Sequence, residues 1–168
     1  KLEGINHGLS TLQWIKVTAS PHNPQLLQGG TQDNGTWETP GNPVKWENTM
    51  IGDGGQSGFD ATDPSFRFHT FFDASPDVNF SDGAMEDWNW IADPIYATGG
   101  LFYVPIISDP VVHRTMFVGT TTALRTKTHG MGSMSLDEFR EQCNEWTGLF
   151  QVTCGDWEPL GTTPLNAA

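Results

Sequence analysis

The sequence predicts an all-β fold, and three of its features lead to that prediction. The chain of 168 residues contains 19 glycines and 11 prolines, and only 17% of its residues are charged, which is typical of a chain rich in turns. Its apolar residues show almost no helical periodicity. Short segments rich in β-branched and aromatic residues recur between turn signals, as strands buried between stacked sheets should.

A pattern of two strands joined by a proline-containing turn occurs three times. The copies begin with IKVTASP, SGFDATDP and VPIISDP, and their anchoring prolines are Pro21, Pro64 and Pro110. Repeats of about 40 to 50 residues made of short strands are typical of β-propeller blades. We therefore expect three blades, each an antiparallel four-stranded sheet, in the approximate units 1–46, 47–92 and 93–168.

The first unit contains the stretch LQGGTQDNGTWE, in which Asn34-Gly35 is a strong signal for a two-residue hairpin turn. Residues 31–37, TQDNGTW, resemble the Asp-box of the sialidase-like β-propellers (BNR repeats), whose pattern is Ser/Thr-x-Asp-x-Gly-x-Thr-Trp. This copy has one residue fewer between the glycine and the tryptophan. A degraded second copy is TKTHG at 126–130, and residues 9–60 are similar to the BNR/YVTN-type propellers that are grouped with sialidases and xyloglucan-degrading enzymes.

This resemblance implies structural rather than catalytic roles for Asp33, Gly35 and Trp37. In that family the box lies on the hairpin between the third and fourth strands of a blade. Its aspartate accepts hydrogen bonds from backbone N–H groups of the turn, which is a bonding pattern that Asp favours. Its tryptophan packs between neighbouring blades.

The second unit opens with the glycine-rich loop GDGGQSG, residues 52–58, which lacks the lysine of a nucleotide-binding loop. Because this loop leads into the innermost strand of the expected blade, Asp53 and Asp60 are the acids best placed for ligand contact or catalysis. The alternative is a structural loop in which the glycines form a tight turn and Asp53 caps its backbone.

The acidic stretch at 73–90, DASPDVNFSDGAMEDWNW, is a candidate calcium site, with Asp73, Asp77 and Asp82 as ligands. Calcium requires hard oxygen ligands of this kind, although the stretch does not follow the EF-hand pattern. A solvated acidic loop is the alternative. Trp88 and Trp90 could stack on sugar rings, and we expect one of the two to belong to the core.

The third unit contains one short helix near 135–143, in which Ser135 caps the N-terminus and Glu138 completes a capping box. We interpret this helix as an insertion. The only cysteines, Cys143 and Cys154, are predicted to form a local disulfide, the alternative being two buried free thiols. A disulfide in turn favours an extracellular or secreted protein.

Charge and length limit the partners of the chain. A formal net charge of −12 argues against nucleic acid, whose phosphates require a basic surface, and no apolar run is long enough to span a membrane. Propellers close with about four to eight blades, so three units leave the ring incomplete. We expect a fragment, completed by further blades of the same protein or by another chain of the same assembly.

Two functions are compatible with these features. The first is an extracellular BNR-type propeller segment that acts as a structural module or binds carbohydrate or protein. The second is part of a xyloglucanase-like glycoside hydrolase, with Asp53 or Asp60 as one of its two carboxylates. A sialidase is disfavoured because such enzymes use an arginine cluster, whereas the four arginines here are well separated, at Arg67, Arg114, Arg125 and Arg140. We favour the non-catalytic function.

Overall fold

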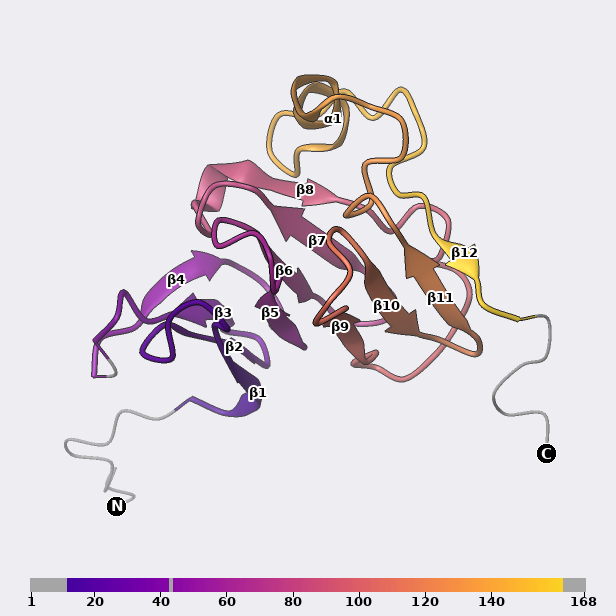
Figure 1. Ribbon diagram of the computed structural model, residues 1–168. Coiled ribbons are helices and arrows are strands. Elements are labelled where there is room, and N and C mark those ends of the chain that lie inside the picture. Colours follow the sequence, from indigo (N-terminus) through magenta and orange to yellow (C-terminus); the bar gives the residue numbers. More distant parts are fainter. Residues whose placement is uncertain (1–11, 43, 162–168) are drawn as a thin grey trace, which may run out of the picture.

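The computed structural model describes residues 12–42 and 44–161, and their fold consists of three four-stranded antiparallel sheets (Figure 1). Sheet 1 comprises β1 (Trp14–Ala19), β2 (Leu27–Thr31), β3 (Gly35–Glu38) and β4 (Glu47–Met50). Sheet 2 comprises β5 (Ser57–Phe59), β6 (Arg67–Thr70), β7 (Pro76–Asn79) and β8 (Trp88–Trp90). Sheet 3 comprises β9 (Ile106–Ser108), β10 (Met116–Gly119), β11 (Ala123–Thr126) and β12 (Glu158–Pro159). The expected all-β class with four-stranded antiparallel sheets is confirmed.

Within each sheet, strands that follow one another in the sequence are also neighbours in space. The β4 strand pairs with β3 and so belongs to sheet 1, whereas the sequence-based boundary at residue 46 assigned it to the second unit. The parts of the first and third units at 1–11 and 162–168 lie outside the described residues.

The turn after the first strand of each sheet is built in the same way. Side-chain oxygens of Ser20, Asp60 and Asp109 each accept a hydrogen bond from the backbone N–H two residues further on. Such local bonding is what Ser and Asp favour in turns. Since Ser20 and Asp60 occupy equivalent positions, Pro24 rather than Pro21 is the counterpart of Pro64.

The first strands of the three sheets lie together, and the sheets spread apart from them. β5 contacts both β1 and β9, while Figure 1 shows β4, β8 and β12 at the far ends of the three sheets. Glycines make the approach of sheet 1 to the loop before β5 possible, because a Cβ added at Gly30 would lie 2.1 Å from the Gly55 carbonyl oxygen. The two glycine-rich motifs of the sequence therefore pack against each other.

The two spaces between the sheets differ in chemistry. Apolar side chains fill the space between sheets 2 and 3, and they include Phe68, Val78, Ile106, Met116 and Val118. Burying each such side chain contributes about 1.5 to 3 kcal/mol. The space between sheets 1 and 2 combines the buried apolar side chains of Met50 and Trp88 with polar pairs. Thr36 is bonded there to His69, and Glu38 is paired with Arg67.

The predicted helix and disulfide are both confirmed. Helix α1 (Leu136–Cys143) begins after Ser135, whose side chain forms the expected capping box with Glu138, and Cys143 is bonded to Cys154. The insertion between β11 and β12 that contains them packs along β8, where the Glu145 N–H donates to the Trp88 carbonyl oxygen. None of the helices in the described part of the chain is long and apolar enough to cross a membrane.

Candidate functional site

The two acids predicted to contact a ligand lie at opposite ends of sheet 2. Asp53 precedes β5, while Asp60 follows it directly. Asp53 is bonded to Asp33 and Tyr103, whereas Asp60 is bonded to Thr62 and His129, so the two carboxylates have no neighbour in common among these partners. Paired carboxylates of a glycoside hydrolase lie about 5 to 9.5 Å apart, so Asp53 and Asp60 do not form such a pair.

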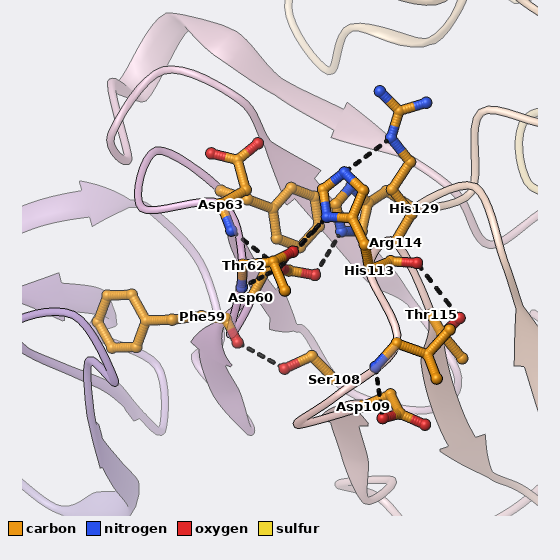
Figure 2. Close-up of polar contacts among 12 residues, drawn as sticks. Phe59, Asp60, Thr62, Asp63, Ser108, Asp109, His113, Arg114, Thr115 and His129 are labelled. Carbon is orange, nitrogen blue, oxygen red and sulfur yellow. Dashed lines mark hydrogen bonds and ion pairs between the residues drawn. The ribbon is translucent and has the colours of Figure 1, made fainter.

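Asp60 is a fully buried carboxylate that accepts hydrogen bonds from several donors (Figure 2). Its Oδ1 accepts from the backbone N–H and the hydroxyl of Thr62, both at 2.6 Å, and from the Asp63 N–H at 3.0 Å. Its Oδ2 lies 2.8 Å from Nε2 of His129, which is itself buried. Asp60 was a candidate on its sequence position, whereas Thr62 and His129 carry no local pattern that predicts a bond to it.

His113 is connected to Asp60 through the hydroxyl group of Thr62. Thr62 gives its only hydroxyl proton to Asp60, so it accepts a hydrogen bond from Nδ1 of His113. Nε2 of His113 then accepts from Nε of Arg114 at 3.2 Å. The Thr62 hydroxyl donates to a carboxylate whose pKa is lowered, and such a carboxylate is a weak general base, so it activates the hydroxyl little as a nucleophile.

Asp60 also joins the three sheets. His22, from the loop after β1, lies with Nε2 3.0 Å from the Asp60 carbonyl oxygen. His113 follows β9, and His129 follows β11, where its ring stacks on Phe66 at a centroid distance of 3.7 Å. One residue of sheet 2 is thus bonded to residues of sheets 1 and 3.

The protonation states of this cluster indicate a structural role. Burial raises the pKa of Asp60, but hydrogen bonds from Thr62 and His129 outweigh it, so that the pKa lies below its usual range. Burial lowers the pKa of His129, although Asp60 opposes that shift. At neutral pH an ionised carboxylate is therefore bonded to a neutral imidazole. A carboxylate with so low a pKa is a poor base, and the cluster holds the sheets together.

Asp53 organises the opposite end of the sheets. Its Oδ1 accepts from the Asp33 N–H at 3.0 Å and from the Tyr103 hydroxyl at 3.1 Å. Partial burial and the hydrogen bond to Asp53 raise the pKa of Tyr103 to about 12. Asp53 does accept from a turn amide, as the structural alternative expects, but this amide belongs to the hairpin of sheet 1 and not to the loop of Asp53.

The structure corrects the expected placement of the Asp-box. Residues 31–37 lie on the hairpin between β2 and β3, the second and third strands of sheet 1, not between the third and fourth. Asp33 and Gly35 have positive φ, and Thr31 pairs with Gly35, so the turn is not a two-residue turn at Asn34-Gly35. The Asp33 side chain is exposed and accepts no hydrogen bond within the described residues; its backbone N–H donates instead. The expected role of its carboxylate is therefore wrong.

Box-like turns do follow the third strands of sheets 2 and 3. Oδ1 of Asn79 accepts from the N–H groups of Ser81 and Gly83. In the degraded copy at 126–130, Oγ1 of Thr126 accepts from Thr128 and Gly130 in the same pattern. Sequence reasoning missed the copy at 79–83 because asparagine takes the position of the first Ser/Thr of the box.

The structure does not bring the three proposed calcium ligands together. Asp77 is fully buried in β7, whereas the side chain of Asp82 is 74% exposed and lies 3.6 Å from Nη2 of Arg67. Asp73 lies in the turn between β6 and β7, with a backbone bridge to Tyr103. Across residues 12–42 and 44–161, no group of three or more His, Cys, Asp or Glu side chains could hold a metal ion.

The tryptophans also depart from expectation. Trp88 is fully buried, and its Nε1 donates to the Thr49 carbonyl oxygen between sheets 1 and 2, so it cannot stack on a ligand. Trp90 is partly buried, and its Nε1 donates to Asp93. Of the two, Trp90 is the one that presents a surface to solvent. Residues two apart on a strand share one face, so Trp88 is buried because sheet 1 packs over it and not because the strand side chains alternate.

A second buried cluster contains His69, Asp77 and Glu145. Nε2 of His69 lies 3.5 Å from Oδ2 of Asp77, and both side chains are fully buried. Neither side-chain oxygen of Asp77 has a hydrogen-bond partner within the described residues, so nothing offsets the cost of burying its charged form. Burial raises the pKa of Asp77 and of Glu145 to about 8, and burial lowers the pKa of His69 to about 3.

This cluster predicts a stability that declines in mild alkali. In the unfolded chain the two carboxyls titrate near pH 4, so the folded state retains protons that the unfolded state has lost. Stability from this source is lost as pH rises toward about 8. His69 acts in the opposite sense, but only below its unfolded pKa of about 6.5. We therefore expect the free energy of unfolding to fall between pH 6.5 and about 8, by up to about 1.4 kcal/mol per pH unit for each proton held, and to level off above that.

Chemical denaturation at several pH values checks this expectation. Glu145→Gln keeps a neutral polar group beside Asp77 but removes one titrating carboxyl. The free energy of unfolding of this variant should therefore fall less steeply with pH than that of wild type. An equally steep decline in that variant would assign the pH dependence to other groups.

The family-model scan finds no match to this chain, and neither does the search of curated proteins.

Proposed function

We propose that this chain is a sector of a larger β-propeller and serves as a structural or binding module within it. Three meandering sheets that spread from adjacent first strands are the arrangement expected of neighbouring blades. Completing such a ring requires further blades against the outer faces of sheets 1 and 3. The disulfide is compatible with an extracellular location, which we propose for the module.

The outer face of sheet 1 is the observation that carries this proposal. Val17, Gly29 and Trp37 are paired across β1, β2 and β3, so they share the face opposite to the one that contacts sheet 2. The Trp14 ring covers Gly29, and it lies 4.5 Å from the ring of Trp46 between centroids. All three tryptophans are only partly buried. A face of this kind suits packing against another apolar sheet.

The loop end that carries Asp53 is the proposed ligand-binding surface of the module. The rings of Phe72 and Phe102 stack there at 5.9 Å, and both are exposed. Phe102 also packs edge-on against Tyr103, which donates to Asp53. Exposed aromatic rings beside a carboxylate suit carbohydrate or protein ligands and disfavour anionic ones.

A hydrolase is less well supported. A pocket of about 360 Å³ between sheets 1 and 2 is lined by Glu38 and Asp82, among others. Burial raises the pKa of Glu38, although Arg67 opposes the shift. Both carboxylates lie against the same buried Arg67 guanidinium, so neither is free to protonate a leaving group.

Placing a charge on the outer face of sheet 1 tests the proposal. Val17→Lys puts an ammonium group among the tryptophans, at a position that is already 44% exposed. We expect weaker self-association in sedimentation velocity, with little change in the free energy of unfolding, because surface substitutions usually change it by about 0.5 kcal/mol or less. The matched control is Val112→Lys, in the loop before β10, which should sediment as wild type. Equal behaviour of the two variants would remove sheet 1 as an interaction face.

A further inference from the structure

The segment closed by the disulfide displays large apolar side chains to solvent. Trp146, Leu149, Phe150 and Val152, here called the apolar lobe, are between 45% and 51% exposed. Figure 1 shows that the segment after α1 projects beyond β8, away from the three sheets. The lobe is therefore separate from the outer faces of sheets 1 and 3, where further blades are proposed.

The lobe is exposed although its backbone is well fixed. Oδ1 of Asn144 accepts from the N–H groups of Trp146 and Thr147, and the N–H groups of Leu149 and Phe150 donate to carbonyl oxygens of α1. The Trp146 indole donates to the Met85 carbonyl oxygen at 2.6 Å. Together with the disulfide, these bonds hold apolar side chains in place before any partner arrives, which lowers the entropy lost on binding.

Phe150 is held in an unfavourable backbone conformation. Its φ is +49°, in the left-handed region, which a bulky side chain rarely adopts. The ring gains little from folding in return, because about half of it is exposed. A strained residue that does not serve the core is a reason to look for a function.

The surroundings of the lobe are acidic. Residues 141–161 contain no lysine or arginine, while Glu86 and Glu141 are exposed beside the lobe. The nearest arginine, Arg140, is occupied by a bidentate pair with Asp87. An apolar centre with an acidic rim complements a partner that combines apolar and basic side chains, and it repels anionic membranes.

We propose that the apolar lobe is a docking surface for a basic, apolar segment of a partner protein. The exposed Trp146 and Phe150 are the central contacts, since rigid aromatic side chains dominate the binding energy of interfaces. The exposed acids supply orientation and a dependence on salt concentration. This surface is independent of ring closure, so its test and that of the proposed function can fail separately.

The test uses the 168-residue chain and a synthetic amphipathic peptide with leucines on one face and lysines on the other. Fluorescence titration should show binding that weakens with salt, and the same peptide with glutamate in place of lysine should not bind. Phe150→Gly removes the ring and suits the positive φ. We expect it to weaken binding by about tenfold or more, as loss of an interface hot spot does, with an unchanged or higher melting temperature.

Val112→Ser is the matched control, because it removes an exposed apolar side chain outside the lobe. It should bind the lysine peptide as wild type does. Equal affinities of Phe150→Gly and wild type would overturn the proposal, since the charges alone would then explain binding. Binding to phosphatidylcholine vesicles that Phe150→Gly abolishes would also overturn it, because the lobe would then be a membrane contact.

Discussion

Replacing Glu38 with alanine is expected to destabilise the protein by about 3 to 5 kcal/mol, because the substitution leaves a buried guanidinium without its partner. The Arg67 side chain is 2% exposed, and its Nε lies 2.7 Å from Oε2 of Glu38. Its Nη1 donates to backbone carbonyl oxygens, and its guanidinium lies over the Phe59 ring. Among the residues that the structure describes, the exposed Asp82 would remain as the charged neighbour, at 3.6 Å.

The double variant Glu38→Ala with Arg67→Met separates the charge effect from packing. Removing both members of a buried ion pair is often nearly neutral, so the double variant should recover most of the loss. Urea denaturation of wild type, the single variant and the double variant measures this. If the single variant costs less than about 1 kcal/mol, the ion pair is not the main bond between sheets 1 and 2.

Removing the disulfide is expected to cost about 3 kcal/mol, from the chain entropy released in a short loop. Cys143 and Cys154 are 11 residues apart and both fully buried, so Cys→Ala at both positions avoids placing a polar group in the core. The loss should appear in thermal or chemical unfolding under oxidising conditions. Reduced wild type should be destabilised by a similar amount. A double variant as stable as oxidised wild type would mean that hydrogen bonds alone hold the segment.

Features that depend on neighbouring residues could be predicted from the sequence. The capping box of Ser135 and Glu138 acts within one helical turn, and the helix was found where it was expected. Alternating apolar residues predicted strands, and the short spacing of Cys143 and Cys154 predicted their bond. In the helix cap and the disulfide, the deciding residues lie close together in the sequence, at most 11 positions apart.

Features that depend on contacts between sheets could not be predicted in this way. Asp60 was singled out, but its bond to His129 joins two turns 69 residues apart. Asp33 matches the Asp-box aspartate in sequence, yet the turn amide at this position donates to Asp53, from another loop. Trp88 was predicted as a ligand contact, but sheet 1 packs over it, and its indole N–H donates to the Thr49 carbonyl oxygen. A local sequence pattern does not show which loop of another sheet will supply the hydrogen-bond partner of a residue.

Sedimentation velocity of the 168-residue chain alone, at micromolar concentration, tests the propeller-sector proposal most directly. Apolar surface contributes about 25 cal/mol per Å² when it is buried, so the uncovered apolar outer face of sheet 1 should drive association. We therefore expect self-associated or aggregated species at this concentration. A stable monomer with a sharp, cooperative melt would contradict the proposal, because its outer faces would then need no further blades.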